Sequence, residues 1–186
     1  MLGRDETGAL WVFGYGSLIW NPGFVFAERR AARLAGFSRA FCLRSIRYRG
    51  TPAAPGLVLA LAERAGAECR GLAYRVAPDH AEAAHAYLRE REMVTDSYLE
   101  TVQELEVEGL GPIRALAYVI DETHPQFADL SPRAQAEIIV AASGPAGTNR
   151  DYLHNTVAHL RELGLPDAEL EALDLEVRAL AGERQG

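Results

Sequence analysis

The most distinctive stretch of this chain is WVFGYGSLIW, residues 11–20, in which a strand-like apolar run ends in two glycines that flank one tyrosine. Glycine allows a backbone to approach a ligand closely, so the N–H groups of such a loop can converge on an anion or oxyanion. The stretch matches neither of two common motifs: a dinucleotide fingerprint needs glycine at Ile19, and a nucleophile elbow needs glycines two residues on either side of Ser17. The residues alone leave open a ligand-binding loop or a strand-end bulge packed by Trp11 and Trp20.

Outward from this stretch, apolar runs rich in β-branched and aromatic residues predict six strands, near 10–14, 33–43, 57–63, 69–76, 99–107 and 113–120. The turn at Gly109–Pro112 predicts that the last two strands pair antiparallel. Helices are expected over 79–92, 131–142, 149–163 and 167–181. Strands first and helices last indicate an α+β fold, whereas a doubly wound nucleotide-binding fold alternates them from the start.

Length and composition fit one globular domain. The 186 residues compare with a usual size of about 150 per domain, and no linker-like or repeated segment divides them. The N-terminus lacks the apolar region of a secretory signal, and the longest apolar runs, such as Leu57–Ala62, are too short to cross a membrane. Cys42 and Cys69 show no C-x-x-C spacing, so free thiols and a reducing, cytoplasmic location are expected.

Basic residues are distributed unusually. All 19 are arginine, and the absence of lysine excludes the Walker A loop and Schiff-base mechanisms. The segment from Arg29 to Arg49 holds seven arginines and no acid, although the net charge of the chain is −7. Nucleic-acid binding is disfavoured by that net charge, while small anionic substrates remain open. The interpretation that accounts for most of these arginines is a solvated strand face paired with the acidic strand bearing Glu100, Glu104, Glu106 and Glu108.

Histidine and cysteine do not predict a metal site or a thiol nucleophile. His80 with His85, and His154 with His159, are each five residues apart, which places the rings about 140° around a helix from one another. The two cysteines lie in apolar strand patterns that are typical of buried, inert thiols. No metal site is therefore expected.

The helix expected over 79–92 ends in two charged residues of interest. Arg91 falls near the centre of the apolar stripe that includes Leu88, and Glu92 falls on its flank. A carboxylate partly withdrawn from water gains a raised pKa and can act as a general base near neutral pH. Spacing alone favours the alternative that both are surface charges near a helix C-terminus.

Several short motifs follow the first stretch in a definite order. Together with residues 12–20, they resemble the ChaC-like gamma-glutamylcyclotransferases over residues 11–155: Arg49-Gly50, Pro55-Gly56, Gly71-Leu72-Ala73-Tyr74-Arg75, Tyr87-Leu88 before Arg91-Glu92, and Gly144-Pro145-x-Gly147-x-Asn149-x-x-Tyr152-Leu153.

The resemblance implies a mixed six-stranded β-barrel flanked by helices. It also implies one domain over 1–186, with a core over 11–155 and a C-terminal helical extension over 156–186. The implied reaction is a cofactor-free cleavage of gamma-glutamyl peptides, typically glutathione, to 5-oxoproline and Cys-Gly. Because the α-amine of the substrate attacks its own γ-carbonyl, such an enzyme supplies no nucleophile. A chain without lysine or an activated serine is sufficient for this chemistry.

The resemblance also assigns roles to residues. The catalytic carboxylate maps onto Glu92, which would serve as general acid and base. The substrate cradle maps onto the loop comprising Gly14, Tyr15, Gly16, Ser17, Leu18 and Ile19, while Arg49 and Tyr152 are expected to orient carboxylates or line the pocket. The segment 93–96 lacks the paired glycines of some glutathione-specific members, so the preferred leaving amine stays open.

Two other functions remain as alternatives. One is a cyclotransferase for other gamma-glutamyl amines or amino acids. The other is a non-catalytic binding or regulatory module related to cation transport, which the presence of Glu92 with the whole glycine loop disfavours. The expected partner is a small-molecule substrate. Neither nucleic acid nor a membrane is expected as a partner, and the oligomeric state is left open.

Overall fold

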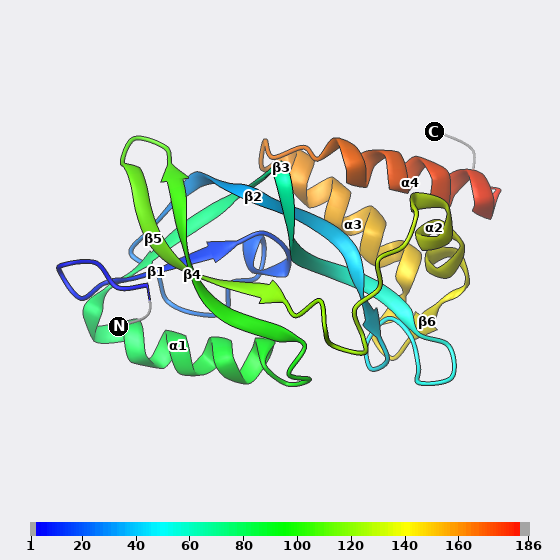
Figure 1. Cartoon of the computed structure of the whole chain (residues 1–186), viewed down its shortest axis with the longest axis horizontal. Helices are drawn as coiled ribbons and strands as arrows, with labels where there is room; N and C mark the ends of the chain where they lie inside the picture. Colours follow the sequence, from blue (N-terminus) through cyan, green and yellow to red (C-terminus); the bar gives the residue numbers. More distant parts are fainter. Residues whose placement is uncertain (1–2, 183–186) are drawn as a thin grey trace. The chain divides into compact units, whose positions relative to one another are not determined.

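The computed structural model describes residues 3–182 and has strands in its first two thirds and mainly helices in its last third (Figure 1). Its elements are β1 (Leu10–Gly14), η1 (Ser17–Ile19), β2 (Glu28–Ser45), β3 (Gly56–Val76), α1 (Pro78–Glu92), β4 (Tyr98–Val107), β5 (Gly111–Ile120), α2 (Pro132–Ala141), β6 (Ser143–Gly144), β7 (Gly147–Thr148), α3 (Asn149–Glu162) and α4 (Ala168–Ala181). The predicted α+β class is confirmed.

The chain forms two compact units that are interleaved in sequence. Unit 1 comprises Met1–Arg39 and Leu61–Asp121, and unit 2 comprises Ala40–Ala60 and Glu122–Gly186. The boundary between them falls inside β2 and inside β3, so each of these strands contributes residues to both units.

A closed barrel with the strand order β1-β3-β2-β4-β5 organises unit 1. β1 runs antiparallel to β3 and pairs with β5 in parallel at Val12 and Leu116, so the barrel is mixed. β4 and β5 form an antiparallel hairpin that starts with Tyr98 opposite Ile120, which confirms the predicted pairing. Closure leaves these strands without an unpaired edge along the ring.

The strand count differs from the prediction, because residues 57–63 and 69–76 belong to one continuous strand, β3. The polar residues between them look like a turn in the sequence, but they form an exposed part of that strand. Gly66 has a φ of +78°, a left-handed conformation that is typical of bulges in long, bent strands. Glycine marks both turns and bulges, so the sequence does not separate five strands from six.

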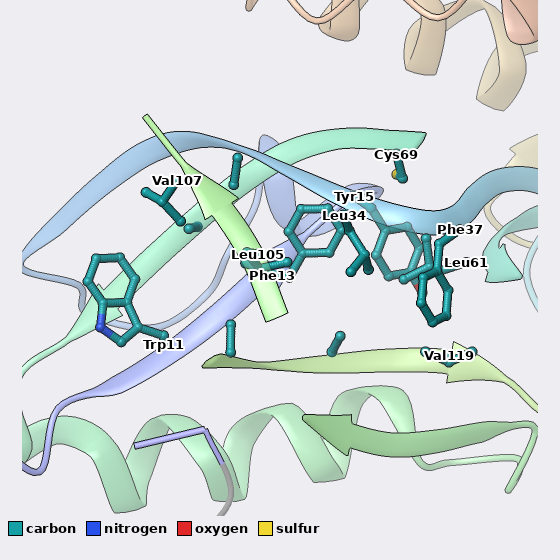
Figure 2. Close-up of a cluster of buried hydrophobic side chains, with 14 residues drawn as sticks. Trp11, Phe13, Tyr15, Leu34, Phe37, Leu61, Cys69, Leu105, Val107 and Val119 are labelled. Atoms are coloured by element: carbon teal, nitrogen blue, oxygen red, sulfur yellow. The ribbon is translucent and has the colours of Figure 1, made fainter. Parts of the chain in front are cut away.

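The core of unit 1 fills the barrel (Figure 2). Alternate residues of β1 point into it, as the period of a strand requires. The cluster consists of Trp11, Phe13, Tyr15, Ala32, Leu34, Phe37, Leu61, Cys69, Ala73, Leu105, Val107, Ala115, Ala117 and Val119. The predicted helix over 79–92 is confirmed as α1, whose apolar stripe is buried at Ala81, Ala84 and Leu88.

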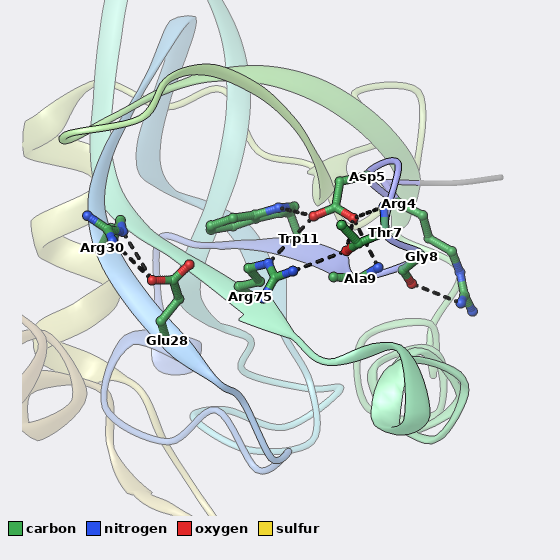
Figure 3. A network of polar contacts seen from close by, with 9 residues as sticks. All are labelled: Arg4, Asp5, Thr7, Gly8, Ala9, Trp11, Glu28, Arg30 and Arg75. Carbon is green, nitrogen blue, oxygen red and sulfur yellow. Dashed lines mark hydrogen bonds and ion pairs between the residues drawn. The ribbon is translucent and has the colours of Figure 1, made fainter.

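A polar network fixes the segment before β1 (Figure 3). The carboxylate of Asp5 accepts hydrogen bonds from the backbone N–H of Thr7 at 2.9 Å and from the indole of Trp11 at 3.2 Å, and lies 3.5 Å from Arg75. Burial raises the pKa of Asp5, but hydrogen bonds from Thr7, Trp11 and Ala9 outweigh burial and hold the pKa below its usual value. The network ties this segment to β1 and β3.

The arginines of β2 form only in part the solvated strand face, paired with an acidic strand, that the sequence predicts. Arg33 lies opposite Glu106 in the register of β2 and β4, and its guanidinium is 3.4 Å from Glu68. Arg39 differs, because only 2% of its surface is exposed. One of the seven arginines is therefore buried, and the sequence gives no signal that separates it from the others.

Unit 2 contains the helices α2, α3 and α4, which pack on one another. All three predicted helices are confirmed within two residues at either end. Each has a capping side chain: Ser131, Thr148 and Asp167 accept hydrogen bonds from the backbone N–H groups three residues further on. The short hairpin of β6 and β7 leads directly into α3.

Candidate functional site

The glycine loop of unit 1, Gly14–Ile19, begins where β1 ends and continues into η1. Its residues are buried except Ser17, which is half-buried. The hydroxyl of Tyr15 donates to the backbone carbonyl of Tyr118 on β5 at 2.9 Å. A buried tyrosine thus connects the loop to β5, the strand that pairs with β1 in parallel, and the loop keeps a fixed shape.

Strand β3 holds the same loop from another direction. The hydroxyl of Tyr74 lies 2.9 Å from the carbonyl oxygen of Leu18 and 3.0 Å from that of Ile19. A Cβ atom on Gly14 would come within 3.0 Å of the Tyr74 ring, and one on Gly71 would overlap the carbonyl of Gly14. These glycines are therefore needed for the close approach of β1 and β3, whichever ligand the loop binds.

Arg91 joins the end of α1 to the glycine loop. Its guanidinium donates to Ser17 Oγ at 2.8 Å and to the carbonyl of Asn21 at 2.7 Å, while its Nε lies 3.2 Å from Glu92 Oε1. One side chain contacts both the loop and the candidate base. The alternative that Arg91 and Glu92 are surface charges is wrong, since their side chains are only 21% and 17% exposed.

The carboxylate of Glu92 has the electrostatic environment that a base requires. Burial raises its pKa, and the neighbouring Arg91 lowers it, but burial dominates and the pKa is above the usual value for glutamate. A carboxylate of raised pKa accepts a proton more readily and returns it near neutral pH. Burial at the end of α1 thus prepares Glu92 for proton transfer in both directions.

A second buried carboxylate, Glu100, lies in unit 1. The hydroxyl of Tyr118 donates to its Oε1 at 3.0 Å, His85 Nε2 lies 2.8 Å from the same oxygen, and Arg89 donates to Oε2 at 3.3 Å. The side chain of Glu100 is 10% exposed, so it does not belong to a solvated acidic face. The register of the predicted hairpin is the sequence signal for it, because it places Glu100 opposite Tyr118.

Two of the predicted binding residues meet in unit 2. The guanidinium of Arg49 lies over the ring of Tyr152, 5.3 Å from its centroid, and donates to the carbonyl of Thr148 at 3.2 Å. Phe41 contacts the same ring edge to face at 5.6 Å. Arg49 and Tyr152 are half-buried, so this stacked pair presents part of its surface to solvent.

The other family motifs of unit 2 have a structural role. Asn149 is completely buried, and its side-chain amide exchanges two hydrogen bonds with the backbone of Leu57, at 2.6 and 2.7 Å. Added Cβ atoms on Gly50, Gly56 or Gly144 would overlap backbone atoms of neighbouring segments. These residues allow three backbone segments to approach one another closely.

Other kinds of site are absent from residues 3–182, the described part of the chain. No group of three or more His, Cys, Asp and Glu side chains there is placed to hold a metal ion. Cys42 and Cys69 are both buried, and neither forms a disulfide. Within the same residues, no helix has the length and apolar character needed to span a membrane.

Comparison with known proteins gives consistent matches. The ChaC-like protein family matches residues 10–180. The chain is 40% identical over 181 residues to the glutathione-specific gamma-glutamylcyclotransferase of Escherichia coli (strain K12), covering 97% of this chain and 78% of the relative. It is 35% identical over 178 residues to the human glutathione-specific gamma-glutamylcyclotransferase 1, covering 94% and 80%.

Solved structures agree with this result. The crystal structure of a gamma-glutamylcyclotransferase specific to glutathione from yeast superposes with a TM-score of 0.80 at 25% identity, covering 93% of this chain and 99% of that one. The family match extends to residue 180 and so covers nearly all of α4, which follows the last of the ordered motifs in the sequence. With the fold, the ordered motifs and these relatives in agreement, the chain belongs to the ChaC-like family of proteins.

Proposed function

We propose that this protein is a gamma-glutamylcyclotransferase that degrades glutathione to 5-oxoproline and Cys-Gly, a carbon–nitrogen lyase that forms a ring as it cleaves an amide. The observation that carries the proposal is the half-buried carboxylate of Glu92, linked through Arg91 to the glycine loop. The relatives of this protein in Escherichia coli and human are named as glutathione-specific, and they support the choice of substrate.

In the proposed reaction, Glu92 takes a proton from the α-ammonium group of the glutamyl residue. The free amine attacks the γ-carbonyl carbon and closes a five-membered ring. The bond from that carbon to the cysteine nitrogen then breaks, and Glu92 returns the proton to the departing nitrogen. The ring nitrogen, which is positively charged after the attack, loses its second proton, and the departing amine takes up one proton and leaves as an ammonium. The raised pKa of Glu92 suits both transfers. Because attack is intramolecular, a well-held substrate gains an effective molarity of about 10⁵ M or more.

The glycine loop Gly14–Ile19 is the proposed cradle for the glutamyl group. Its fixed shape, held by Tyr74 and Tyr15, supports this role, because binding then requires little ordering of the loop. Its backbone N–H groups are proposed to stabilise the oxyanion that forms on the γ-carbonyl.

Arg49 and Tyr152 are separately proposed to bind substrate. Their stacked, half-buried arrangement leaves a cation and a phenol partly accessible, which suits a carboxylate of the peptide. Cys42 and Cys69 do not form a disulfide, which supports a reducing compartment, and we propose the cytoplasm.

The test is release of 5-oxoproline from glutathione by the purified protein. A panel of other gamma-glutamyl amino acids and amines is assayed beside it, with the variant Glu92→Gln and the control Glu90→Gln. Glu90 is an exposed carboxylate on the same helix, so it controls for the loss of one charge from α1. We expect activity on glutathione that is lost in Glu92→Gln and kept in Glu90→Gln.

Activity on other gamma-glutamyl compounds alone would keep the mechanism and change the substrate. Absence of 5-oxoproline from every compound would contradict the proposal and favour a binding or regulatory module.

A further inference from the structure

Glu100 is a buried carboxylate that the proposed reaction does not use. Ala117 and Val119 of β5 belong to the barrel core, so Tyr118 between them faces the opposite side of the sheet. Glu100 lies across from Tyr118 on β4, on that same side. Contacts with His85 and Arg89 show that this side faces α1.

The hydrogen bonds of Glu100 fix the direction of one hydroxyl group. An ionised carboxylate only accepts hydrogen bonds, so the hydroxyl hydrogen of Tyr118 must point toward Glu100 Oε1, 3.0 Å away. His85 at 2.8 Å and Arg89 at 3.3 Å hold the carboxylate in place. The hydroxyl of Tyr118 is therefore already committed as a donor.

Glu92 lies on the same face of α1 as these groups. His85, Arg89 and Glu92 are spaced i, i+4 and i+7, so they line one side of the helix within two turns. Glu92 is one turn beyond Arg89, which contacts Glu100. The charge of Glu92 also acts on Tyr118, so the phenol is influenced by two carboxylates, and it donates to the one that the reaction does not use.

We propose that Glu100 is a positioning residue for the acid and base chemistry of Glu92: by accepting the hydroxyl hydrogen of Tyr118, it keeps that donor away from the Glu92 carboxylate and so preserves its strength as a base. This inference rests on the proposed function.

The physical reason is the effect of a donor on a carboxylate. A hydrogen bond donated to an ionised carboxylate stabilises the ionised form, which lowers its pKa and weakens the base. Burial first, and then the charge of Glu100 and its hydrogen bond, raise the pKa of Tyr118, and the charge of Glu92 adds to this effect. The phenol therefore stays protonated and remains a donor across the working pH range.

The test is the dependence of kcat/KM for 5-oxoproline release on pH, whose acidic limb reports the ionisation of Glu92 in the free enzyme. In Glu100→Gln, the amide can donate to the phenol oxygen, which frees the Tyr118 hydroxyl to turn toward Glu92. We expect the acidic limb to move to lower pH by about one unit, with kcat/KM at neutral pH reduced about three- to tenfold.

Three other variants complete the test. Tyr118→Phe removes the donor, so we expect its acidic limb to stay at the wild-type position. Glu100→Gln added to Tyr118→Phe is expected to cause no further shift. Glu104→Gln removes an exposed carboxylate four residues along the same strand, and no shift is expected.

An undiminished shift in the Tyr118→Phe background would overturn the inference, because Glu100 would then act through its charge alone. If the acidic limb of the pH profile does not move in Glu100→Gln, the inference is also overturned. A lower Tm in the same variant would then give Glu100 a purely structural role. A shift in Tyr118→Phe by itself would mean that Tyr118 already donates to Glu92, which contradicts the inference. If the wild type releases no 5-oxoproline from any substrate, the proposed function and this inference fail together; every other outcome concerns Glu100 only.

Discussion

The motif residues of unit 1 and unit 2 serve different physical purposes. In unit 1, the motifs end in ionisable groups: Arg91 contacts Glu92 and the glycine loop, and the buried Glu92 has a raised pKa. In unit 2, Asn149 and the motif glycines satisfy or accommodate backbone atoms. Residues that mark one family thus include some that carry the proposed chemistry and others that allow close packing.

This difference predicts two patterns of mutational effect. Changes at Glu92 or Arg91 should reduce activity more than stability, whereas changes at Asn149 should reduce stability first. The Arg49 and Tyr152 pair is the exception in unit 2, since its half-buried surface is open to a ligand.

The largest effect on stability is expected for Asn149→Ala. The substitution leaves the buried N–H and C=O of Leu57 without their partners, at a cost of about 1–3 kcal/mol each, or roughly 2–6 kcal/mol in all. Denaturant unfolding measures the loss. Asn155→Ala, at an exposed position of the same helix, should stay within about 0.5 kcal/mol of wild type. If Asn149→Ala and Asn155→Ala lost similar amounts of unfolding free energy, the structural role given to the unit 2 motifs would be contradicted.

Arg91→Gln should affect activity most strongly among the residues around Glu92. It removes the bonds to Ser17 and Asn21, so we expect kcat/KM to fall about 10- to 100-fold. It also removes the positive charge that lowers the pKa of Glu92, so the acidic limb of the pH profile should move to higher pH. A limb that moves to lower pH would contradict the assigned electrostatics.

Glu92→Gln should increase stability at neutral pH while it removes activity. The folded-state pKa of Glu92 is raised, so the folded state binds the proton more tightly and stability falls as pH rises through this pKa. A neutral glutamine avoids that cost, and we expect a gain on the order of 1 kcal/mol at pH 7 that disappears in acid. Thermal unfolding at several pH values measures it, and a large destabilisation at pH 7 would give Glu92 a structural role.

The smallest effect is expected for Asp5→Asn, away from the proposed chemistry. The pKa of Asp5 is lowered, so its contribution to stability is present above the unfolded pKa and is lost as pH falls through the folded one. We expect a loss of about 0.5–1 kcal/mol at pH 7, with wild type and variant converging in strong acid, and unchanged kcat/KM. Reduced activity at equal stability would place this network in the site.

Much of the fold could be predicted, because local patterns specify it. The periodicity of the helices and the hairpin turn before β5 are local signals, and the structure agrees with the predicted helices and hairpin. The caps at Ser131, Thr148 and Asp167 are likewise local. The continuity of β3 could not be predicted, since Gly66 in a bulge looks like glycine in a turn.

The site was predictable only in part. The glycine loop and Glu92 emerge from the family resemblance, while helical spacing favoured a solvated Glu92. Its burial depends on Arg91 reaching the loop at Ser17, a contact between residues 74 positions apart in the sequence. The burial of Arg39 and the environment of Glu100 likewise depend on tertiary packing, which places them beneath or between elements that the sequence lists separately.

The central claim is that Glu92 is the single acid and base of a ring-forming cleavage. The most direct measurement is the rate of 5-oxoproline release from glutathione by wild type, Glu92→Gln and Glu90→Gln at equal concentrations of folded protein. We predict that Glu92→Gln loses about 10²- to 10⁴-fold in kcat, whereas Glu90→Gln keeps the wild-type rate. A Glu92→Gln variant that retains most of the wild-type rate would contradict the claim.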